Sequence, residues 1–208
     1  TIYLLYIIML MIPITTSCTS DDDNLNIPGN EPTALYEVKS DIQLPINILL
    51  GNIPDEYAGI AEQVTSIFTQ RENALVKETG KQGINLGFRK ITYLYHSTDI
   101  NNDPITLSAV AIWPGYFHNG VWNDIKPDNI CLMEHYTITS DAEAPSNTFS
   151  FEMFITGNTL TIMPDYIGYG ITKEIPHPYL NHEVCAINSI DALTAGYDLF
   201  KDKNKNGM

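Results

Sequence analysis

The sequence is poor in positive charge. Only 11 of its 208 residues are Lys or Arg, against 25 Asp or Glu, so the formal net charge is −14. Nucleic-acid binding needs clustered Lys and Arg to contact phosphates, and this balance argues against it. Charged residues make up only 17% of the chain, whereas hydrophobic residues make up 44%. That composition is typical of a globular protein with a buried core and not of a disordered one.

Cysteine is scarce too. Apart from Cys18, the chain has Cys131 and Cys185, which lie in the apolar segments ICLM and VCAI. Such surroundings are typical of buried thiols, and we predict that both are free. An oxidising compartment would permit a disulfide between them, and the sequence leaves that alternative open because it does not give the distance between their Cα atoms.

The N-terminal hydrophobic run is too short to span a bilayer comfortably. Residues 1–13, TIYLLYIIMLMIP, instead have the length of a signal-peptide core. Thr16 and Ser17 precede Cys18 as in a bacterial lipobox, where the cysteine is lipidated and becomes the mature N-terminus, although Leu is usual one position before them. We therefore expect residues 1–17 to be a lipoprotein signal peptide whose basic first segment is missing. The alternative is an ordinary signal peptide with an incidental cysteine.

An acidic, Pro- and Asn-containing segment follows over residues 18–32. Its TSDDD start resembles the tether of Bacteroidota surface lipoproteins. The alternative is a loose cation site, but three adjacent carboxylates without fixed geometry bind calcium poorly. The resemblance implies an exported bacterial lipoprotein of the outer membrane, exposed at the cell surface and attached to the membrane through lipid on Cys18.

Residues 33–89 form a lead-in with one clear helical pattern. Apolar residues recur at helical spacing over 60–77, and Gly80 and Gly83 are placed to end that helix. We predict a helix that packs ahead of the main sheet.

The pattern changes its period at about residue 90. Short β-branched, aromatic or apolar segments predict four strands, at 90–97, 104–114, 129–137 and 159–164. The turn-forming TDINND between the first two predicts an antiparallel hairpin, and the apolar later two are typical of parallel strands. A short helix capped by Ser146 and Asn147 and a long helix over 182–201 are predicted to follow them. This order predicts an α/β fold in which an antiparallel hairpin leads into parallel strands with crossover helices.

The segment after the fourth predicted strand departs most from ordinary composition. In PDYIGYGIT, Asp165 is followed by Gly168, Tyr169 and Gly170 in a D-x-x-G-x-G-x-[ST] pattern. The glycines can take positive φ where the chain turns sharply, and the carboxylate can accept hydrogen bonds from the loop's own N–H groups. We interpret these four residues as a structural loop at the carboxyl edge of the sheet, where ligands bind in α/β folds.

This loop resembles the one that follows the fourth strand of the α/β-hydrolase fold. The preceding predicted strand ends in EHYT (134–137), where that fold typically has a His-Gly pair at the start of its oxyanion loop. The segments APSN (144–147) and PHPYL (176–180) look like the secreted lipase and prolyl-oligopeptidase-related branches of the superfamily. The resemblance covers about residues 90–200.

The resemblance implies a serine hydrolase that acts on a small ester, lipid or peptide substrate without a cofactor. Ester substrates are favoured over peptide substrates. It makes His135, Tyr136 and Thr137 candidates for the oxyanion loop, whose backbone N–H groups stabilise negative charge during acyl transfer. Tyr136 stands where glycine is usual.

The sequence contains no G-x-S-x-G, the nucleophile motif that this fold carries after its fifth strand. The nearest spacing is GINLG (83–87), which has Asn at its centre and precedes the predicted sheet. We therefore expect residues 90–208 to be the N-terminal part of a hydrolase domain, truncated before the fifth strand and inactive alone, with Ser, Asp and His of the triad beyond Met208. The alternatives are a non-catalytic surface binding protein on a hydrolase scaffold and a serine peptidase of the same fold.

Other kinds of site fit the pattern less well. His177 and His182 are five positions apart with Pro178 between them, which matches no helical pair of zinc ligands. A dinucleotide cradle would need a third glycine after Gly168 and Gly170. Aromatic residues between the second and third predicted strands could line a substrate site, but packing against the sheet is the favoured interpretation for Trp113, Phe117, His118 and Trp122.

Overall fold

The computed structural model describes residues 35–50, 58–148 and 158–205. The chain divides into two compact units, Thr1–Pro32 and Thr33–Met208, and the described residues all belong to the second. The predicted signal peptide, the acidic tether and Cys18 therefore lie outside them, as does most of the short helix predicted after Asn147.

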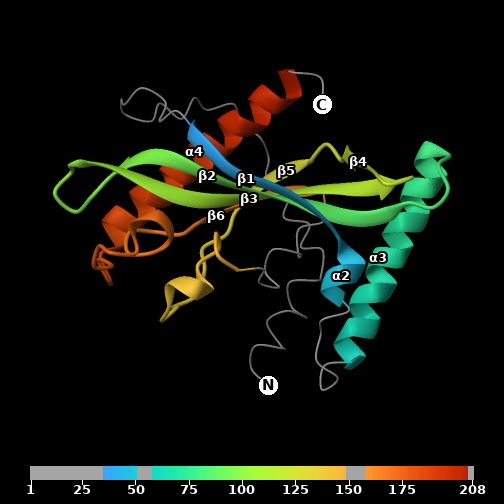
Figure 1. Cartoon of the computed structure of the whole chain (residues 1–208), viewed down its shortest axis with the longest axis horizontal. Coiled ribbons are helices and arrows are strands. Elements are labelled where there is room, and N and C mark those ends of the chain that lie inside the picture. Colours follow the sequence, from blue (N-terminus) through green and yellow to red (C-terminus); the bar gives the residue numbers. More distant parts are fainter. Residues whose placement is uncertain (1–34, 51–57, 149–157, 206–208) are drawn as a thin grey trace, which may run out of the picture. The chain divides into compact units, whose positions relative to one another are not determined.

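The described residues form one mixed sheet of six strands in the order β1-β2-β3-β6-β5, with β4 paired to β3 (Figure 1). The pairs β1–β2, β2–β3, β3–β4 and β3–β6 are antiparallel, whereas β5 and β6 are parallel. The strands are β1 (Leu35–Pro45), β2 (Asn85–Thr98), β3 (Pro104–His118), β4 (Val121–Asp124), β5 (Asn129–Leu132) and β6 (Thr159–Pro164).

The predicted hairpin and the predicted parallel pair are both confirmed, although β5 ends at Leu132 and not at Thr137 as predicted. The hairpin of β2 and β3 is longer than the pattern indicated and is paired in register from Asn85–Phe117 to Thr98–Pro104. Its turn depends on Asp99, whose Oδ1 accepts hydrogen bonds from the backbone N–H groups of Asn101 and Asp103. β6 lies between β3 and β5, so the parallel pair is joined to the hairpin in one sheet.

The lead-in contains a strand that its pattern did not predict. β1 pairs with β2 along its length and is followed by the short helix α2 (Ile46–Leu50). β1 lies at the edge of the sheet, and Val38 and Ile42 remain exposed, so it lacks the apolar pattern of a covered strand. With β1 and β4 included, the loop at Asp165 follows the sixth strand among the described residues and not the fourth.

Two long helices confirm the predictions made from the helical spacing of apolar residues. The helix α3 (Ala58–Thr79) ends where Gly80, at φ 71°, donates its N–H to the carbonyl of Val76. Phe68 of this helix packs against a small cluster that consists of Ile46, Ile84, Leu86 and Tyr116.

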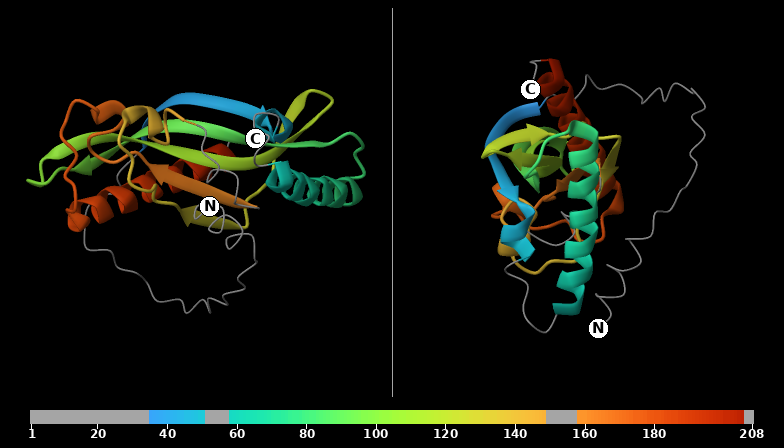
Figure 2. Two further views of the ribbon diagram at one scale, coloured as in Figure 1. Left: turned by 90° about the horizontal axis from the view of Figure 1, so that it is seen from below. Right: turned by 90° about the vertical axis from the view of Figure 1, so that its right-hand side faces the viewer.

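The helix α4 (His182–Lys205) lies against one face of the sheet, as Figure 2 shows. Its small residues let the helix approach closely, because a Cβ on Gly196 would overlap the side chain of Ile162. The hydroxyl of Tyr93 on β2 donates to the carbonyl of Ala192 at 2.6 Å. Alternate residues of β2, β3 and β6 meet α4 in the main core, while the opposite face carries a second cluster of Phe88, Val110, Ile112 and Met163.

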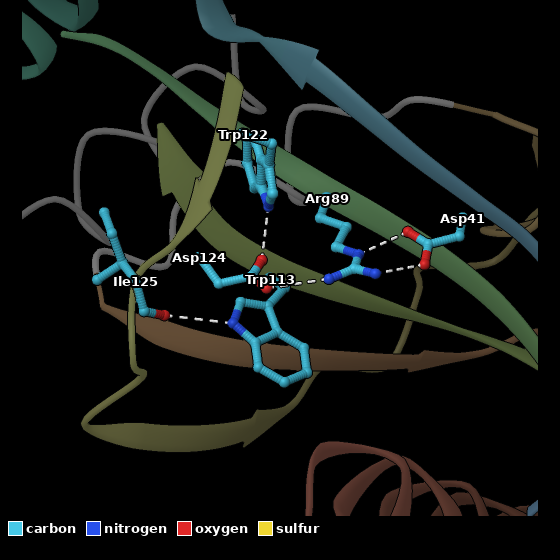
Figure 3. Close-up of polar contacts among 6 residues, drawn as sticks. All are labelled: Asp41, Arg89, Trp113, Trp122, Asp124 and Ile125. Carbon is cyan, nitrogen blue, oxygen red and sulfur yellow. Dashed lines mark hydrogen bonds and ion pairs between the residues drawn. The ribbon is translucent and has the colours of Figure 1, made fainter. Parts of the chain in front are cut away.

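A buried arginine joins three strands (Figure 3). Arg89 on β2 donates two hydrogen bonds of 2.6 Å to the carboxylate of Asp41 on β1 and one of 3.0 Å to Asp124 on β4. The indole N–H of Trp122 donates to the other oxygen of Asp124 at 2.6 Å. These hydrogen bonds raise the pKa of the guanidinium further, so Arg89 stays charged while it is buried.

The aromatic residues near β4 pack on the sheet, as the favoured interpretation predicted. Trp122 covers the cross-strand pair Gly87 and Gly115, where a Cβ would collide with its ring. Its ring also meets Phe117 edge-on at 5.1 Å, and Trp113 contacts Phe200 of α4 at 5.0 Å between ring centroids.

Cys131 and Cys185 are free thiols, as predicted, but both are half-buried and not fully buried. Burial raises the pKa of each thiol. Within the described ranges, no helix is both long and apolar enough to cross a membrane.

Candidate functional site

The carboxyl ends of the parallel strands β5 and β6 lie at the same edge of the sheet. Residues 133–148 follow β5 and are called here the β5 loop, and residues 165–181 follow β6 and are called the β6 loop. The predicted oxyanion residues lie in the first, and the glycine-containing motif lies in the second. This is the edge at which α/β sheets bind ligands.

Asp165 links the two loops to the middle of the sheet. Its side chain is fully buried, and one carboxylate oxygen accepts a 2.5 Å hydrogen bond from the hydroxyl of Ser108 on β3. The other oxygen accepts a 2.8 Å bond from the backbone N–H of Ser146 in the β5 loop. The hydroxyl oxygen of Ser108 in turn accepts a bond from the N–H of Ile171 at 3.2 Å.

These contacts correct one part of the sequence interpretation. The carboxylate of Asp165 was expected to accept N–H groups of its own loop, but Ser108 stands between it and the N–H of Ile171. Burial raises the pKa of Asp165, while the hydrogen bonds from Ser108 and Ser146 and the nearby His135 oppose that rise. The carboxylate thus gains hydrogen-bond partners on β3 and in the β5 loop that compensate in part for its lost hydration.

A buried lysine holds the far end of the β5 loop. The ammonium group of Lys90 on β2 donates to the carbonyl oxygens of Ser146 at 3.2 Å and Thr148 at 2.5 Å. Burial lowers the pKa of Lys90 to about 8, and the charge of Asp165 opposes the shift. Ser146 is therefore bound on both sides, through its N–H by Asp165 and through its carbonyl by Lys90.

Two further hydrogen bonds join the loops directly. The carboxylate of Asp141 in the β5 loop accepts from the backbone N–H of Gly170 at 2.6 Å. The hydroxyl of Tyr169 in the β6 loop donates to the carbonyl of Ile138 at 2.9 Å. The two loops are thus fixed to each other as well as to the sheet.

The glycines of the motif are required by space as well as by backbone conformation. Gly168 has φ 93°, and a Cβ there would lie 2.8 Å from the backbone N of His177. Gly170 has φ 58°, and a Cβ there would overlap the side chains of Ser108 and Asp165. Tyr166 also has a positive φ of 67°, which the sequence pattern did not reveal.

The predicted oxyanion residues lie beside this motif. His135 places Nε2 at 3.3 Å from the carbonyl oxygen of Asp165 and Nδ1 at 2.7 Å from that of Tyr136. The hydroxyl of Thr137 accepts from Tyr179 at 3.3 Å, and the side chain of Tyr136 is exposed. The structure therefore brings the start of the β5 loop against both ends of the β6 loop, and the oxyanion role of these residues stays a prediction.

A cluster of aromatic rings at this edge was not foreseen. The imidazole of His135 meets the rings of Tyr166 and Tyr169 edge-on, at 5.0 and 5.9 Å between centroids. His177 lies 6.4 Å from Tyr166, 5.3 Å from Tyr169 and 5.6 Å from Tyr179. The crowding of tyrosines in the β6 loop was visible in the sequence, but the contribution of His135 from the other loop was not.

Tyr166 also ties the site to α4. Its hydroxyl lies 3.2 Å from the hydroxyl of Ser189, which lies 3.2 Å from a carboxylate oxygen of Glu134. Burial raises the pKa of Tyr166 to about 12. These contacts support Tyr166 in its left-handed conformation.

The histidines are not gathered for metal binding. His177 places Nδ1 at 2.6 Å from the carbonyl oxygen of Ile167, and His182 is the first residue of α4. Across the described ranges, no three His, Cys, Asp or Glu side chains come together as a metal site. The edge instead consists of backbone, tyrosine and imidazole groups that contact one another beside the start of the β5 loop.

We predict that Gly170→Ala destabilises the fold by about 3 kcal/mol, because the new Cβ adds steric overlap with Ser108 and Asp165 to the strain of a left-handed residue. Gly120→Ala is the matched control, since Gly120 has φ 77° with open space around it. The control should cost only about 1 kcal/mol. Urea unfolding followed by circular dichroism measures both, and equal losses would contradict the described packing around Gly170.

No family model matches the chain, and no curated protein matches its sequence. Among solved structures, a candidate hydrolase from Legionella pneumophila superposes with a TM-score of 0.52 at 18% identity, over 81% of this chain and 41% of that one. The rice cell wall degrading esterase LipA from Xanthomonas oryzae, in a ligand-bound form, gives a TM-score of 0.44 at 17% identity, over 64% of this chain and 36% of that one. This second likeness is too low to carry an argument. The chain spans less than half the length of either protein, and it shares the α/β fold of the Legionella protein.

Proposed function

We propose that this chain is part of a serine hydrolase that acts on carboxylic esters. The observation that carries the proposal is the meeting of the β5 and β6 loops at the carboxyl edge of two parallel strands, with His135, Tyr136 and Thr137 beside the Asp165 motif. The fold shared with a candidate hydrolase supports it. The serine, acid and histidine of the triad are proposed to lie beyond Met208.

The role we propose for these residues is electrostatic. Hydrolysis of an ester places negative charge on the carbonyl oxygen, and backbone N–H groups fixed in advance stabilise that charge without reorganising. The β5 loop is fixed by Asp165 and Lys90 through Ser146, and by Tyr179 through Thr137. A loop bound at both ends is suited to hold an N–H group in one position.

The loop segments resemble the secreted lipase branch as well as the prolyl-oligopeptidase-related branch, and esters are the substrates proposed first. A peptidase on the same scaffold, or a surface protein that binds without catalysis, would use the same loops. Activity on two substrate types separates these possibilities.

We predict that the 208-residue chain does not hydrolyse p-nitrophenyl acetate, whereas a protein extended along the same reading frame does. The extension should contain G-x-S-x-G within a few tens of residues, because the fold places its nucleophile after the next strand. Replacing that serine by Ala should lower kcat by about a thousandfold or more, and a serine-directed inhibitor should abolish turnover. A peptide p-nitroanilide assayed in parallel tests the peptidase alternative.

Two results would overturn this proposal. One is inhibitor-sensitive turnover by the 208-residue chain, which would move the nucleophile into the present sequence. The other is an intact extended reading frame without the serine motif and without esterase activity, which would leave the non-catalytic binding protein.

We also propose that the protein is an exported lipoprotein, attached to the outer membrane and exposed at the cell surface through lipid on Cys18. Metabolic labelling with a palmitate analogue in a bacterial host should mark the chain when it carries its complete leader. Cys18→Ala should lose the label, while the control Cys131→Ala keeps it. Labelling that persists in Cys18→Ala contradicts the anchor.

A further inference from the structure

The aromatic residues of the two loops form one connected group, called here the ring cluster: His135, Tyr166, Tyr169, His177 and Tyr179. Neighbouring centroids lie 5.0 to 6.4 Å apart, and the contacts are tilted or edge-to-face. These are the separations and orientations that aromatic pairs prefer. An additional aromatic ring would therefore pack against the cluster at the same separations and orientations.

Most polar atoms of the cluster have hydrogen-bond partners within the protein. The hydroxyl of Tyr169 donates to Ile138 and that of Tyr179 to Thr137, while Nδ1 of His177 lies at hydrogen-bond distance from the carbonyl of Ile167. The rings are thus held in place before any ligand arrives, which lowers the entropy that stacking on them would cost. Tyr179 is the ring of the cluster that is most exposed to a ligand.

One side of the cluster faces solvent among exposed apolar residues. Tyr179 is 58% exposed, and Tyr136 next to His135 is 51% exposed. Leu180 is 84% exposed and holds φ 63°, a conformation that is costly for a leucine. Ile171 and Ile175 of the same loop are also exposed. Large apolar side chains left exposed in one loop are candidates for a binding surface.

The charge around the cluster is negative. The two loops carry five carboxylates against the single Lys173, and these are Glu134, Asp141, Glu143, Asp165 and Glu174. The charge of Glu143 is close enough to help raise the pKa of Tyr169, after burial and the nearby Tyr179. A negatively charged ligand would be repelled here, whereas a neutral one would not.

We infer that the ring cluster binds the neutral aromatic group of an ester substrate, beside the candidate oxyanion loop. The inference rests on the proposed function and specifies its substrate class. An aromatic group gains edge-to-face contact with the exposed ring of Tyr179 in addition to burial, whereas a saturated ring of the same size gains burial alone. The surrounding carboxylates favour the neutral ester over the free aromatic acid, so the product of hydrolysis would leave readily.

The test is a binding titration of the 208-residue chain, which needs no turnover. Ligand-observed NMR compares methyl benzoate with methyl cyclohexanecarboxylate, a saturated ester of nearly the same shape, and with benzoate. Methyl benzoate should bind about two- to tenfold more tightly than the saturated ester, which corresponds to one added aromatic contact. Benzoate should bind more weakly than its methyl ester.

Substitutions identify the surface. Tyr179→Leu keeps apolar bulk and should remove the preference for the aromatic ester, whereas Tyr179→Phe keeps the ring and should retain it. Tyr197→Leu is the matched control, because Tyr197 is a 40% exposed tyrosine on α4 outside the cluster. A control that loses the preference as fully as Tyr179→Leu would overturn the assignment.

Equal affinity for the two esters, or no saturable binding of methyl benzoate up to its solubility limit, would also overturn the inference. Its failure is distinguishable from failure of the proposed function. An extended protein that hydrolyses esters, combined with no aromatic preference in the chain, would remove only the inference. Aromatic binding combined with an extended protein that hydrolyses nothing would remove only the hydrolase.

Discussion

The buried carboxylate of Asp165 is the constraint on which the described edge of the sheet depends. A fully buried carboxylate without partners would be too costly, so every oxygen must find a donor. The donors come from two different segments, the hydroxyl of Ser108 in the middle of β3 and the backbone N–H of Ser146 in the β5 loop. Satisfying one side chain therefore fixes the positions of three segments that are distant in sequence.

The other features of the edge follow from that arrangement. Gly170 has no Cβ because Ser108 and Asp165 occupy that space, and Gly168 has none because the backbone of His177 passes there. Once the β6 loop runs so close to the sheet, its Tyr166 and Tyr169 pack both against His135 of the β5 loop and against His177. The same packing that orders the loops creates the ring cluster, and this connects the scaffold to the proposed substrate class.

The sequence predicted the helices and strands that depend on local residue patterns. Alternation and apolar runs located β2, β3, β5 and β6, and the 3.6-residue period located α3 and α4. The sequence could not reveal partners far apart in the chain: Arg89 finds Asp41 across 48 positions, and Ser108 finds Asp165 across 57. β1 was missed for the same reason, since an edge strand is stabilised by its neighbour β2 and not by an apolar pattern of its own. The motif predicted that a sharp turn follows Asp165. Only the fold showed that Asp165 contacts Ser108 and Ser146.

Asp165 couples the β5 loop to the β6 loop. Amide hydrogen exchange measured by NMR in Asp165→Ala tests this coupling, because each loop reports separately. The amides of Ser146 and Ile171 should lose protection together, while the amide of Ala111 in the β2–β3 pairing keeps it. If the amide of Ser146 opens while that of Ile171 stays as protected as in the unmodified chain, the two loops are held independently and the central claim is wrong.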